Sequence, residues 1–285
     1  MHEKDRALIQ SIQEFFRGIG YVSKPNNNSM VEFRVSSIKD IINIILPHFD
    51  NYPLITKKLS DYILFKQVAF LMLNKEHNNL EGLQKIVNLR ASLNWGLPNN
   101  LKEAFPEVIP GEKYNKFSPC QGESTYNNLL PEWVAGFSTG ESNFFIAVQK
   151  SKSKSGLTVW LRFSIGQHSR DLLLLDSLVN FFGCGYVTKY KKRAICEFIV
   201  TKIDHVILHI IPFFEKYPII GSKNFNYLDF KSAANIIKNK EHLNSKGLEQ
   251  ILQLKISSSL INKDKAINNH RDETGNEEIR SKKEK

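Results

Sequence analysis

Asn74-Lys75-Glu76-His77 and Asn239-Lys240-Glu241-His242 are two copies of one tetrapeptide, 165 residues apart (239 − 74). The same offset separates further pairs, which are Tyr52-Pro53 and Tyr217-Pro218, Phe65-Lys66 and Phe230-Lys231, Gly82-Leu83 and Gly247-Leu248, and Glu32-Phe33 and Glu197-Phe198. A constant offset over this length indicates an internal duplication. We therefore expect two similar domains in one chain.

Each copy carries the same order of periodic segments. An amphipathic helix is expected over residues 5–16 and 170–182, followed by a glycine turn, two strands and further helices. The second copy also has a front piece, with a helix over residues 131–140 and alternating strands over 143–149 and 158–166. The predicted fold class is α+β, in which helices cover one face of an antiparallel four-stranded sheet and two strands are missing from the first copy.

The register places the counterpart of this front piece before Met1. Mapping Glu141 back by 165 or 166 residues puts it about 24 residues upstream of Met1, so the first copy is expected to lack its first helix and hairpin. The predicted divisions are a first repeat over 1–96, a proline-containing linker over 97–128, a complete second repeat over 129–263 and a disordered polar tail over 264–285.

The charge of the chain favours a polyanionic partner. The net charge is +10, and residues 150–193 carry nine basic and two acidic residues. Such a distribution is typical of nucleic-acid binding, with solubility alone as the alternative. Cys120, Cys184 and Cys196 show no paired or metal-type spacing and are expected to be reduced thiols. No apolar run reaches the roughly 18 residues of a membrane span, so no membrane partner is expected.

The segment Trp133-Val134-Ala135-Gly136-Phe137-Ser138-Thr139-Gly140-Glu141 has the most specific local pattern. Gly136 and Gly140 are four residues apart and share a helix face, which permits another helix to approach closely. Glu141 follows at the negative end of the helix dipole, where a carboxylate is disfavoured unless a cation binds. A carboxylate beside free carbonyls suits a hard metal such as Mg²⁺. The alternative is a helix that ends at glycine, followed by a glutamate of an edge strand.

These features together resemble the LAGLIDADG homing endonucleases, in particular the single-chain type encoded in fungal organellar introns, over roughly residues 2–262. The resemblance implies two motif helices that pack along small residues, here Ala135, Gly136 and Gly140. It also implies that Glu141 is the catalytic acid and that a metal site at Glu141 and Gly140 binds Mg²⁺ or another divalent ion. Thr139 and Ser142 depart from the usual acid and glycine, but neither is the implied metal ligand.

Further catalytic candidates follow from the resemblance. A basic residue after each Tyr-Pro step corresponds to Lys58 and Lys223, whose ammonium groups could stabilise charge at a cleaved phosphate. A solvated surface lysine is the alternative for each. Gln167 and His168 follow the second strand, where the family often places polar residues that organise water. His168 could equally be a surface residue of a turn.

Strand alternation predicts a DNA-binding surface on and beside the hairpins, because a two-stranded ribbon can enter the major groove and basic residues can hold phosphates. Hairpin charges that only keep a sheet edge soluble are the alternative. The candidates are Gln149, Lys150, Lys152, Arg162, Ser164, Thr188, Lys189, Tyr190, Lys192 and Arg193 in the second copy, and Ser23, Lys24, Asn26, Asn27, Asn28, Glu32 and Arg34 in the first.

Three functions remain open at this point. The first is a sequence-specific, Mg²⁺-dependent endonuclease that cleaves double-stranded DNA. The second is a maturase, which binds intron RNA as a splicing cofactor on the same fold. The third is an inactive remnant. The resemblance further implies a mitochondrial, intron-encoded protein, which would be monomeric with a complete first copy and could otherwise need the missing segment.

Overall fold

The structure of this protein is a computed structural model that describes residues 1–93, 96–111, 129–152, 156–190 and 193–257. Two compact units are present: unit 1 comprises residues 1–9, 24–31 and 127–285, and unit 2 comprises residues 10–23 and 32–126. Two short stretches of the first copy therefore group with the second copy, and the predicted boundaries stay a prediction. Cys120, Lys192, most of the expected linker and the expected tail lie outside the described residues.

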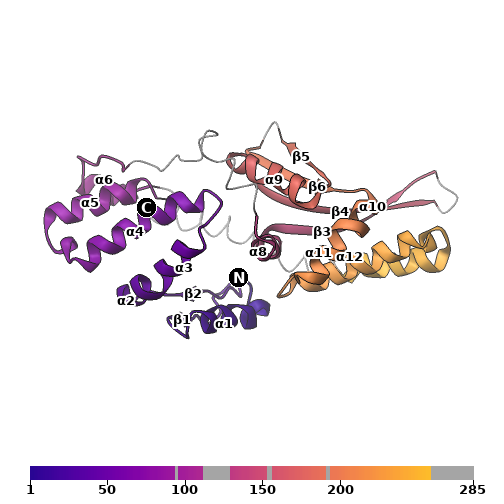
Figure 1. Ribbon diagram of the computed structural model, residues 1–285, viewed down its shortest axis with the longest axis horizontal. Helices are drawn as coiled ribbons and strands as arrows, with labels where there is room; N and C mark the ends of the chain where they lie inside the picture. The colour runs from indigo at the N-terminus through magenta and orange to yellow at the C-terminus, as the bar shows by residue number, and fades with distance from the viewer. Residues whose placement is uncertain (94–95, 112–128, 153–155, 191–192, 258–285) are drawn as a thin grey trace, which may run out of the picture. The chain divides into compact units, whose positions relative to one another are not determined.

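Unit 1 contains a four-stranded antiparallel sheet of strand order β3-β4-β6-β5, which confirms the predicted fold class (Figure 1). The strands are β3 (Ser142–Lys150), β4 (Leu157–His168), β5 (Tyr186–Lys189) and β6 (Ile195–Val200). Helix α8 (Pro131–Glu141) leads directly into β3, and α9 (Leu172–Phe182) lies between β4 and β5 in the sequence. Helix α8 therefore places its last residue directly before β3, an edge strand of the sheet.

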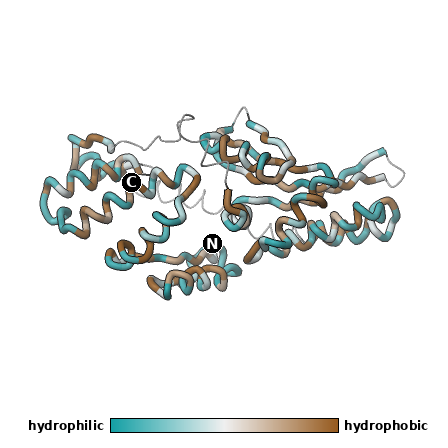
Figure 2. Tube along the Cα trace, viewed as in Figure 1, coloured by the Kyte–Doolittle hydropathy of each residue, from teal (hydrophilic) through white to brown (hydrophobic). Residues whose placement is uncertain are grey.

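Aromatic side chains fill the space between the inner face of this sheet and the helices. Phe144 of β3 contacts Phe163 of β4 at 5.2 Å between ring centroids, and it also contacts Phe230 of helix α12 (Lys223–Lys238) at 5.4 Å. Phe163 and Phe230 are fully buried. Because strand side chains alternate between faces, the intervening residues point away from this core. Figure 2 shows hydrophilic residues where the β3–β4 hairpin approaches its tip.

The other elements of unit 1 follow the sheet along the chain. They are η4 (Ser169–Asp171), α10 (Ile203–His205), the π-helical turn η5 (Val206–Ile210), α11 (Ile211–Lys216), α12 (Lys223–Lys238), the 3-10 turn η6 (Glu241–Leu243) and a helix over residues 245–257. The N-terminal turn η1 (Glu3–Asp5) also belongs to unit 1. Helix α12 contacts β3, and α9 contacts β4, β5 and β6.

Unit 2 is mainly helical. Its elements are β1 (Tyr21–Val22), β2 (Phe33–Arg34), α2 (Ile38–Asp40), the π-helical turn η2 (Ile41–Ile45), α3 (Leu46–Asn51), α4 (Lys58–Leu73), η3 (Glu76–Asn78), α5 (Leu80–Ala91) and α6 (Asn99–Ala104). Helix α1 (Arg6–Phe15) runs from unit 1 into unit 2. The two strands pair over only two residues each, so they are shorter than the strands expected from the sequence. Helix α6 falls in the segment that was expected to be a linker.

The repeated tetrapeptide forms the same turn in both units. Lys75 and Lys240 both adopt the left-handed conformation, with φ of 60°. A 3-10 turn follows, and an asparagine side chain then accepts a bond from the amide of a glycine, at 2.8 Å from Asn79 to Gly82. The second copy repeats this contact at 2.9 Å. The tetrapeptide is therefore a helix–turn–helix connection, which explains its retention in structural terms.

No helix in the described part of the chain is long and apolar enough to cross a membrane.

Candidate active site and nucleic-acid interface

The last turn of α8 presents Glu141 at the surface. Val134 and Ala135 are buried, whereas Gly136 and Gly140 are exposed, and a Cβ at either glycine would meet nothing within 4 Å. The helix thus has a packed side and an open side of small residues. The predicted helix interface corresponds to the open side at the two glycines, while Ala135 lies on the packed side. The role of this open side as a helix–helix interface stays a prediction.

Lys223 holds the end of this helix. Its Nζ donates to the carbonyl oxygen of Gly140 at 3.0 Å and to that of Ser142 at 2.6 Å. Glu141 lies between these two residues in the chain, so the lysine fixes the backbone on both sides of it. A positive charge at the C-terminal end of a helix is favourable, because the last carbonyls carry the negative end of the helix dipole. The structure therefore brings together two of the predicted catalytic residues, Glu141 and Lys223.

The oxygen donors at this helix end suit a hard divalent cation. Glu141 offers an exposed carboxylate, and the Gly140 carbonyl already attracts the Lys223 ammonium. Across the described residues, no group of three or more His, Cys, Asp or Glu side chains could hold a metal. Since Mg²⁺ takes six oxygen ligands and usually keeps several waters, a metal here would need further oxygens from bound phosphates and water.

The other catalytic candidates lie elsewhere in the fold. Lys58 is exposed at the start of α4, the position that Lys223 occupies in α12. Gln167 lies near the end of β4 and pairs with buried Cys196, which puts it in register with the inner face. His168 accepts a bond from the Arg170 amide at 3.2 Å and so caps a 3-10 turn. The catalytic role of Gln167 stays a prediction, and the cap accounts for His168 structurally.

The outer face of the sheet is the side that the aromatic core does not fill. Phe145 pairs with Arg162, Gln149 pairs with Thr158, and Thr188 pairs with Glu197, so these side chains share one face. The predicted DNA-binding residues on this face are Gln149, Arg162, Ser164, Thr188 and, just after β5, Tyr190. Ser164 is only 2% exposed, so its side chain does not reach the surface.

The remaining second-copy candidates lie at strand ends and turns. Lys150 and Lys189 belong to the inner-face register, but both are exposed where their strands end. Lys152 and Arg193 are exposed beside the two hairpin tips. The alternation rule therefore separates these candidates into a face that could contact base edges and ends that could contact phosphates.

Glu197 is a residue of this face that the sequence analysis did not single out in the second copy. Its carboxylate accepts hydrogen bonds from the Arg162 guanidinium and from the Tyr190 hydroxyl. The Arg162–Glu197 pair is partly buried, and the Arg162 Nε–H has no hydrogen-bond partner within the described part of the chain. The signal that could have found Glu197 was its 165-residue offset from Glu32, which was a candidate.

The first-copy candidates form a smaller set of contacts. Glu32 pairs with Arg34, whose guanidinium lies 6.0 Å from the centre of the Tyr21 ring. Ser23 accepts a bond from the Glu32 amide at 3.1 Å. Asn26 accepts bonds from the Asn28 and Met30 amides and so closes its own turn. Lys24 and Asn27 are exposed.

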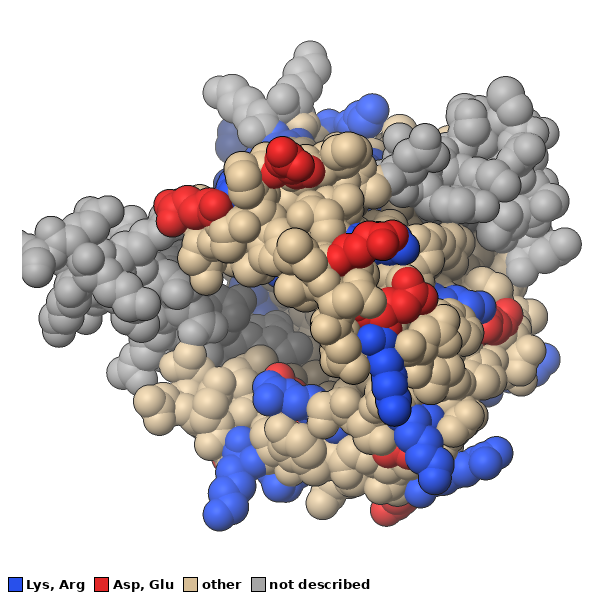
Figure 3. Space-filling view, turned by 90° about the vertical axis from the view of Figure 1, so that its left-hand side faces the viewer, with Lys and Arg blue, Asp and Glu red and all other residues tan. Residues whose placement is uncertain are grey.

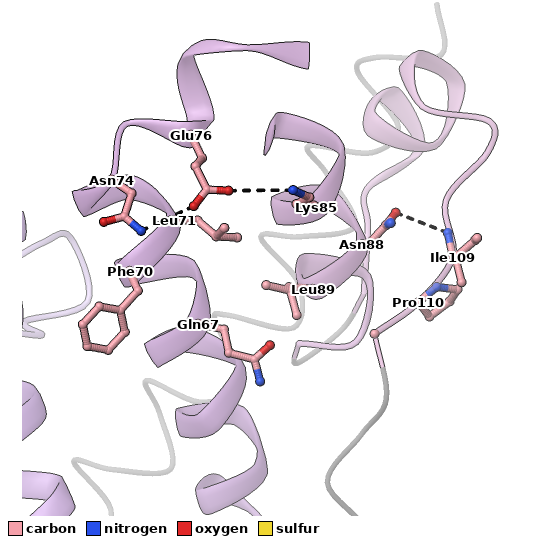
Figure 4. Close-up of a pocket in the computed structure, with 11 residues that line it drawn as sticks. Gln67, Phe70, Leu71, Asn74, Glu76, Lys85, Asn88, Leu89, Ile109 and Pro110 are labelled. Carbon is pink, nitrogen blue, oxygen red and sulfur yellow. Dashed lines mark hydrogen bonds and ion pairs between the residues drawn. The ribbon is translucent and has the colours of Figure 1, made fainter. Parts of the chain in front are cut away.

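A pocket of about 580 Å³ lies in unit 2, away from these candidates in the sequence (Figure 4). It is lined by residues of α4, η3, α5 and the segment around Ile109, and the ion pair between Lys85 and Glu76 spans 3.8 Å at its edge. Figure 3, which looks onto the side of the chain that carries these helices, shows acidic and basic side chains interspersed with uncharged surface. No predicted site residue lines this pocket.

The LAGLIDADG endonuclease family model matches residues 1–69 and 134–234, which is more than half of the chain. The chain therefore belongs to the LAGLIDADG endonuclease family. "Probable intron-encoded endonuclease 2" of Neurospora crassa is 55% identical over 260 residues, which are 90% of this chain and 56% of the relative. "Probable intron-encoded endonuclease 3" of the same organism is 35% identical over 251 residues, which are 88% of this chain and 46% of the relative. The chain spans about half the length of these curated relatives.

Solved structures of the same family match the fold. The I-SmaMI LAGLIDADG homing endonuclease bound to cleaved DNA gives a TM-score of 0.83 at 41% identity, over 90% of this chain and 83% of that chain. I-SmaMI bound to an uncleaved DNA target in the presence of calcium ions gives a TM-score of 0.83 at 41% identity, over 90% and 84% of the two chains. The I-LtrWI homing endonuclease bound to target DNA also gives 0.83, at 39% identity, over 90% and 83%.

Proposed function

We propose that this chain binds double-stranded DNA on the outer face of its four-stranded sheet and cleaves a phosphodiester bond at the end of α8. One observation carries the proposal: Glu141 is exposed between two backbone carbonyls that Lys223 holds, directly before the first strand of the sheet. A DNA backbone on that face would pass the start of β3, where the carboxylate lies. Solved relatives of this chain are bound to DNA, which supports DNA as the ligand.

Each residue of the site has a chemical role in this proposal. Glu141 and the carbonyl oxygen of Gly140 would hold a divalent metal, for which we propose Mg²⁺. When bound, the metal neutralises phosphate charge and favours ionisation of an attacking water. The Lys223 ammonium adds a fixed positive charge beside the same helix end, where it can stabilise the extra negative charge of the transition state. Gln167 is kept as a candidate that orients water from the end of β4.

DNA recognition would divide between the two groups of sheet residues. Arg162, Gln149 and Thr188 point from the outer face and could read base edges in the major groove. Lys150, Lys152, Lys189 and Arg193 lie at strand ends and hairpin tips and could hold phosphates, which makes affinity salt-dependent. Ser23, Lys24 and Arg34 would be the contacts from the first copy.

The intron context of the relatives suggests where the protein acts. "Uncharacterized 50.9 kDa protein in ND4 intron 1" of Podospora anserina is 50% identical to this chain over 74 residues, 26% of this chain and 16% of that protein. We propose that this chain is likewise intron-encoded and acts in the mitochondrion, on the allele that lacks the intron. A fusion to a fluorescent reporter, expressed from its native locus, would check the compartment.

A cleavage assay on a randomised duplex library tests the function. The chain is incubated with Mg²⁺ and, separately, with Ca²⁺, and the cut ends are sequenced. We expect a cut at a defined site in at least one strand with Mg²⁺. Glu141→Gln should reduce the rate at least 100-fold, roughly the effect of removing one group that stabilises transition-state charge, while the duplex is still bound.

Glu132→Gln is the matched control, because Glu132 is an exposed glutamate at the other end of the same helix. It should cleave at the wild-type rate. Absence of any cut, or equal cutting by Glu141→Gln, would contradict the proposed site. A parallel competition between the duplex and the host intron RNA separates the nuclease from the maturase, since a maturase would prefer the RNA.

A further inference from the structure

Asp5 is a buried carboxylate outside the residues assigned to DNA binding and cleavage. It lies in η1 near the N-terminus and is 7% exposed. Its Oδ1 accepts a bond from the Ser222 amide at 2.6 Å, and its Oδ2 accepts one from the Ser222 hydroxyl at 3.0 Å. Both contacts lie within unit 1, although the two residues are 217 positions apart in the chain. A buried carboxylate is costly unless it is hydrogen-bonded, so this pairing is a specific one.

The backbone at Gly221 allows the Asp5 carboxylate to approach closely. Gly221 has φ of 69°, which few side chains tolerate. A Cβ at this position would lie 2.8 Å from the Asp5 Oδ1 and 3.0 Å from Leu8. Glycine is therefore required both by conformation and by the close approach of Asp5. The chain then turns into α12 with the Asn224 amide donating to the Gly221 carbonyl at 3.1 Å.

Asp5 places a negative charge at the start of α12. The first turn of α12 contains no acidic residue, and the N-cap Ser222 makes no capping bond with its own side chain. A negative charge at a helix N-terminus is stabilising, because the free amides there carry the positive end of the dipole. Asp5 provides this charge from a distant part of the sequence and uses the Ser222 hydroxyl as a second anchor.

The residue that follows Ser222 is Lys223, whose ammonium bonds the carbonyls of Gly140 and Ser142. The Ile220 amide also lies 3.5 Å from the Thr139 hydroxyl oxygen, so the same turn contacts the end of α8 twice. Fixing this turn fixes the direction in which the lysine extends. Asp5 can therefore affect the position of Glu141, because it fixes Ser222 and thereby orients Lys223.

We propose that Asp5 is a positioning residue for cleavage, which clamps the start of α12 so that Lys223 holds the backbone around Glu141. The inference rests on the proposed role of Lys223 and Glu141. It requires no contact between Asp5 and DNA, so loss of the clamp should lower the rate of the cleavage step much more than the affinity for DNA.

The test compares Asp5→Ala, Asp5→Asn and Ser222→Ala in the full chain, with Glu3→Gln as the matched control. Glu3 is an exposed acid in the same turn, so its substitution removes the same charge without touching Ser222. In Asp5→Ala, exchange of the Ser222 amide hydrogen should become at least tenfold faster, since a bond to a charged group is lost. Acylation of Lys223 by a succinimidyl ester should also rise several-fold relative to Lys216.

Single-turnover cleavage at saturating DNA should fall about tenfold or more in Asp5→Ala, whereas duplex binding in Ca²⁺ should change less than about threefold. Asp5→Asn keeps one acceptor for the Ser222 amide, so it should reduce the cleavage rate less than Asp5→Ala does. The loss of cleavage rate in the double variant Asp5→Ala/Ser222→Ala should be smaller than the combined losses of the two single variants, because both substitutions remove the same interaction. If Asp5→Ala fails to fold, Asp5→Asn and Ser222→Ala carry the same comparison.

Wild-type exchange at Ser222 and wild-type acylation of Lys223 in the Asp5 variants would overturn the proposal. Cleavage at the wild-type rate by a variant that has lost Ser222 protection would overturn it as well. If the wild-type chain cuts no duplex, the proposed function fails, but exchange and acylation still decide whether Asp5 positions Lys223.

Discussion

At the scale of single residues, Glu197 is unexpected on a sheet face proposed to bind DNA. A lone carboxylate there would repel phosphates, but it accepts bonds from Arg162 and Tyr190. Glu32, its counterpart in the first copy, pairs with Arg34 instead. The two copies thus keep an acid at the same position and take the arginine from different places. Such a pair neutralises the acid and fixes the direction of the guanidinium, which suits a residue that must meet one base edge.

Glu197→Gln is expected to weaken sequence discrimination more than overall affinity. Without the carboxylate, Arg162 loses its fixed direction, and a bidentate contact to a base is worth about 1–3 kcal/mol of discrimination. Competition between the selected target and a scrambled duplex at fixed salt measures this ratio. Glu249→Gln, at an exposed position of the last described helix, controls for the change in net charge. An unchanged ratio would show that Glu197 does not direct Arg162.

At the scale of elements, the helix–turn–helix formed by the repeated tetrapeptide depends on glycine. A Cβ at Gly82 would clash with the carbonyl oxygen of Glu76, and a Cβ at Gly247 would clash with that of Glu241. The two copies therefore share one steric requirement, besides the left-handed lysine and the asparagine cap. The conservation of spacing between the copies follows from this geometry.

Gly82→Ala and Gly247→Ala should each lower the free energy of unfolding by about 1–3 kcal/mol, as overpacking against fixed backbone does. Gly136→Ala should raise it by about 0.5–1 kcal/mol, because the position is helical with open space around it. Urea denaturation of the three variants measures the difference in the free energy of unfolding. Equal effects at the three glycines would contradict the steric account.

A loss of cleavage in a stable Gly136→Leu variant would support the predicted helix interface.

The contact between α3 and α4 makes the stability of unit 2 depend on pH. Hydrogen bonds from the Lys66 ammonium at 2.7 Å and the Tyr62 hydroxyl at 2.7 Å lower the pKa of Asp50 below its ordinary value of 3.8. A carboxyl with a lowered pKa in the folded state adds stability above its unfolded pKa, and this stability is lost as pH falls through the folded pKa.

Asp50→Asn should therefore reduce the free energy of unfolding by about 0.5–1 kcal/mol at pH 7, a small value because both side chains of the ion pair are partly exposed. The difference from wild type should shrink below about pH 4 and vanish near pH 2. Urea unfolding at pH 7, 5 and 3 tests this, with Glu103→Gln on exposed α6 as the control. A difference that does not depend on pH would exclude the ionic contribution.

Features that follow from the repeat and from the alternation of side chains along strands could be predicted from the sequence. Contacts between residues far apart in the chain could not. The strands of the second copy and the position of Glu141 at the end of a helix were predicted from periodicity and glycine spacing. The bond between Asp5 and Ser222 joins residues 217 positions apart, and no local pattern marks it. Ser164 was predicted at the surface because alternation gives a face, but alternation does not say which side chains neighbours cover. Helix α6 was missed because its few residues follow a proline in a segment without periodic apolar positions.

At the scale of the whole molecule, the two copies are packed unequally. Phe65 and Phe230 are counterparts at an offset of 165 residues, yet Phe65 is 41% exposed and Phe230 is fully buried. Phe230 contacts Phe144 of β3, and the described part of the first copy has only the short pair β1–β2 as a sheet. The core of unit 2 instead centres on Leu46, Tyr62 and Ala69. We therefore expect unit 2 to be the less stable unit.

Calorimetry of the intact chain should resolve two transitions, with unit 2 melting first. Phe230→Ala should lower the free energy of unfolding of unit 1 by about 3–5 kcal/mol, since it empties a buried aromatic site. Phe65→Ala should lower the free energy of unfolding of unit 2 by less than Phe230→Ala lowers that of unit 1, because 41% of Phe65 is exposed. Hydrogen exchange at α12 and α4 assigns each transition to its unit. One cooperative transition that both substitutions shift equally would contradict this division.

The π-helical turns record the history of the chain. Residues 41–45 and 206–210 each widen their helix by one residue, at positions 165 apart. Such turns are rare in proteins. Two separate origins at equivalent positions are less economical than one origin that the duplication copied. We therefore expect that the π-helical turn was present before the duplication and that single-copy relatives also contain it.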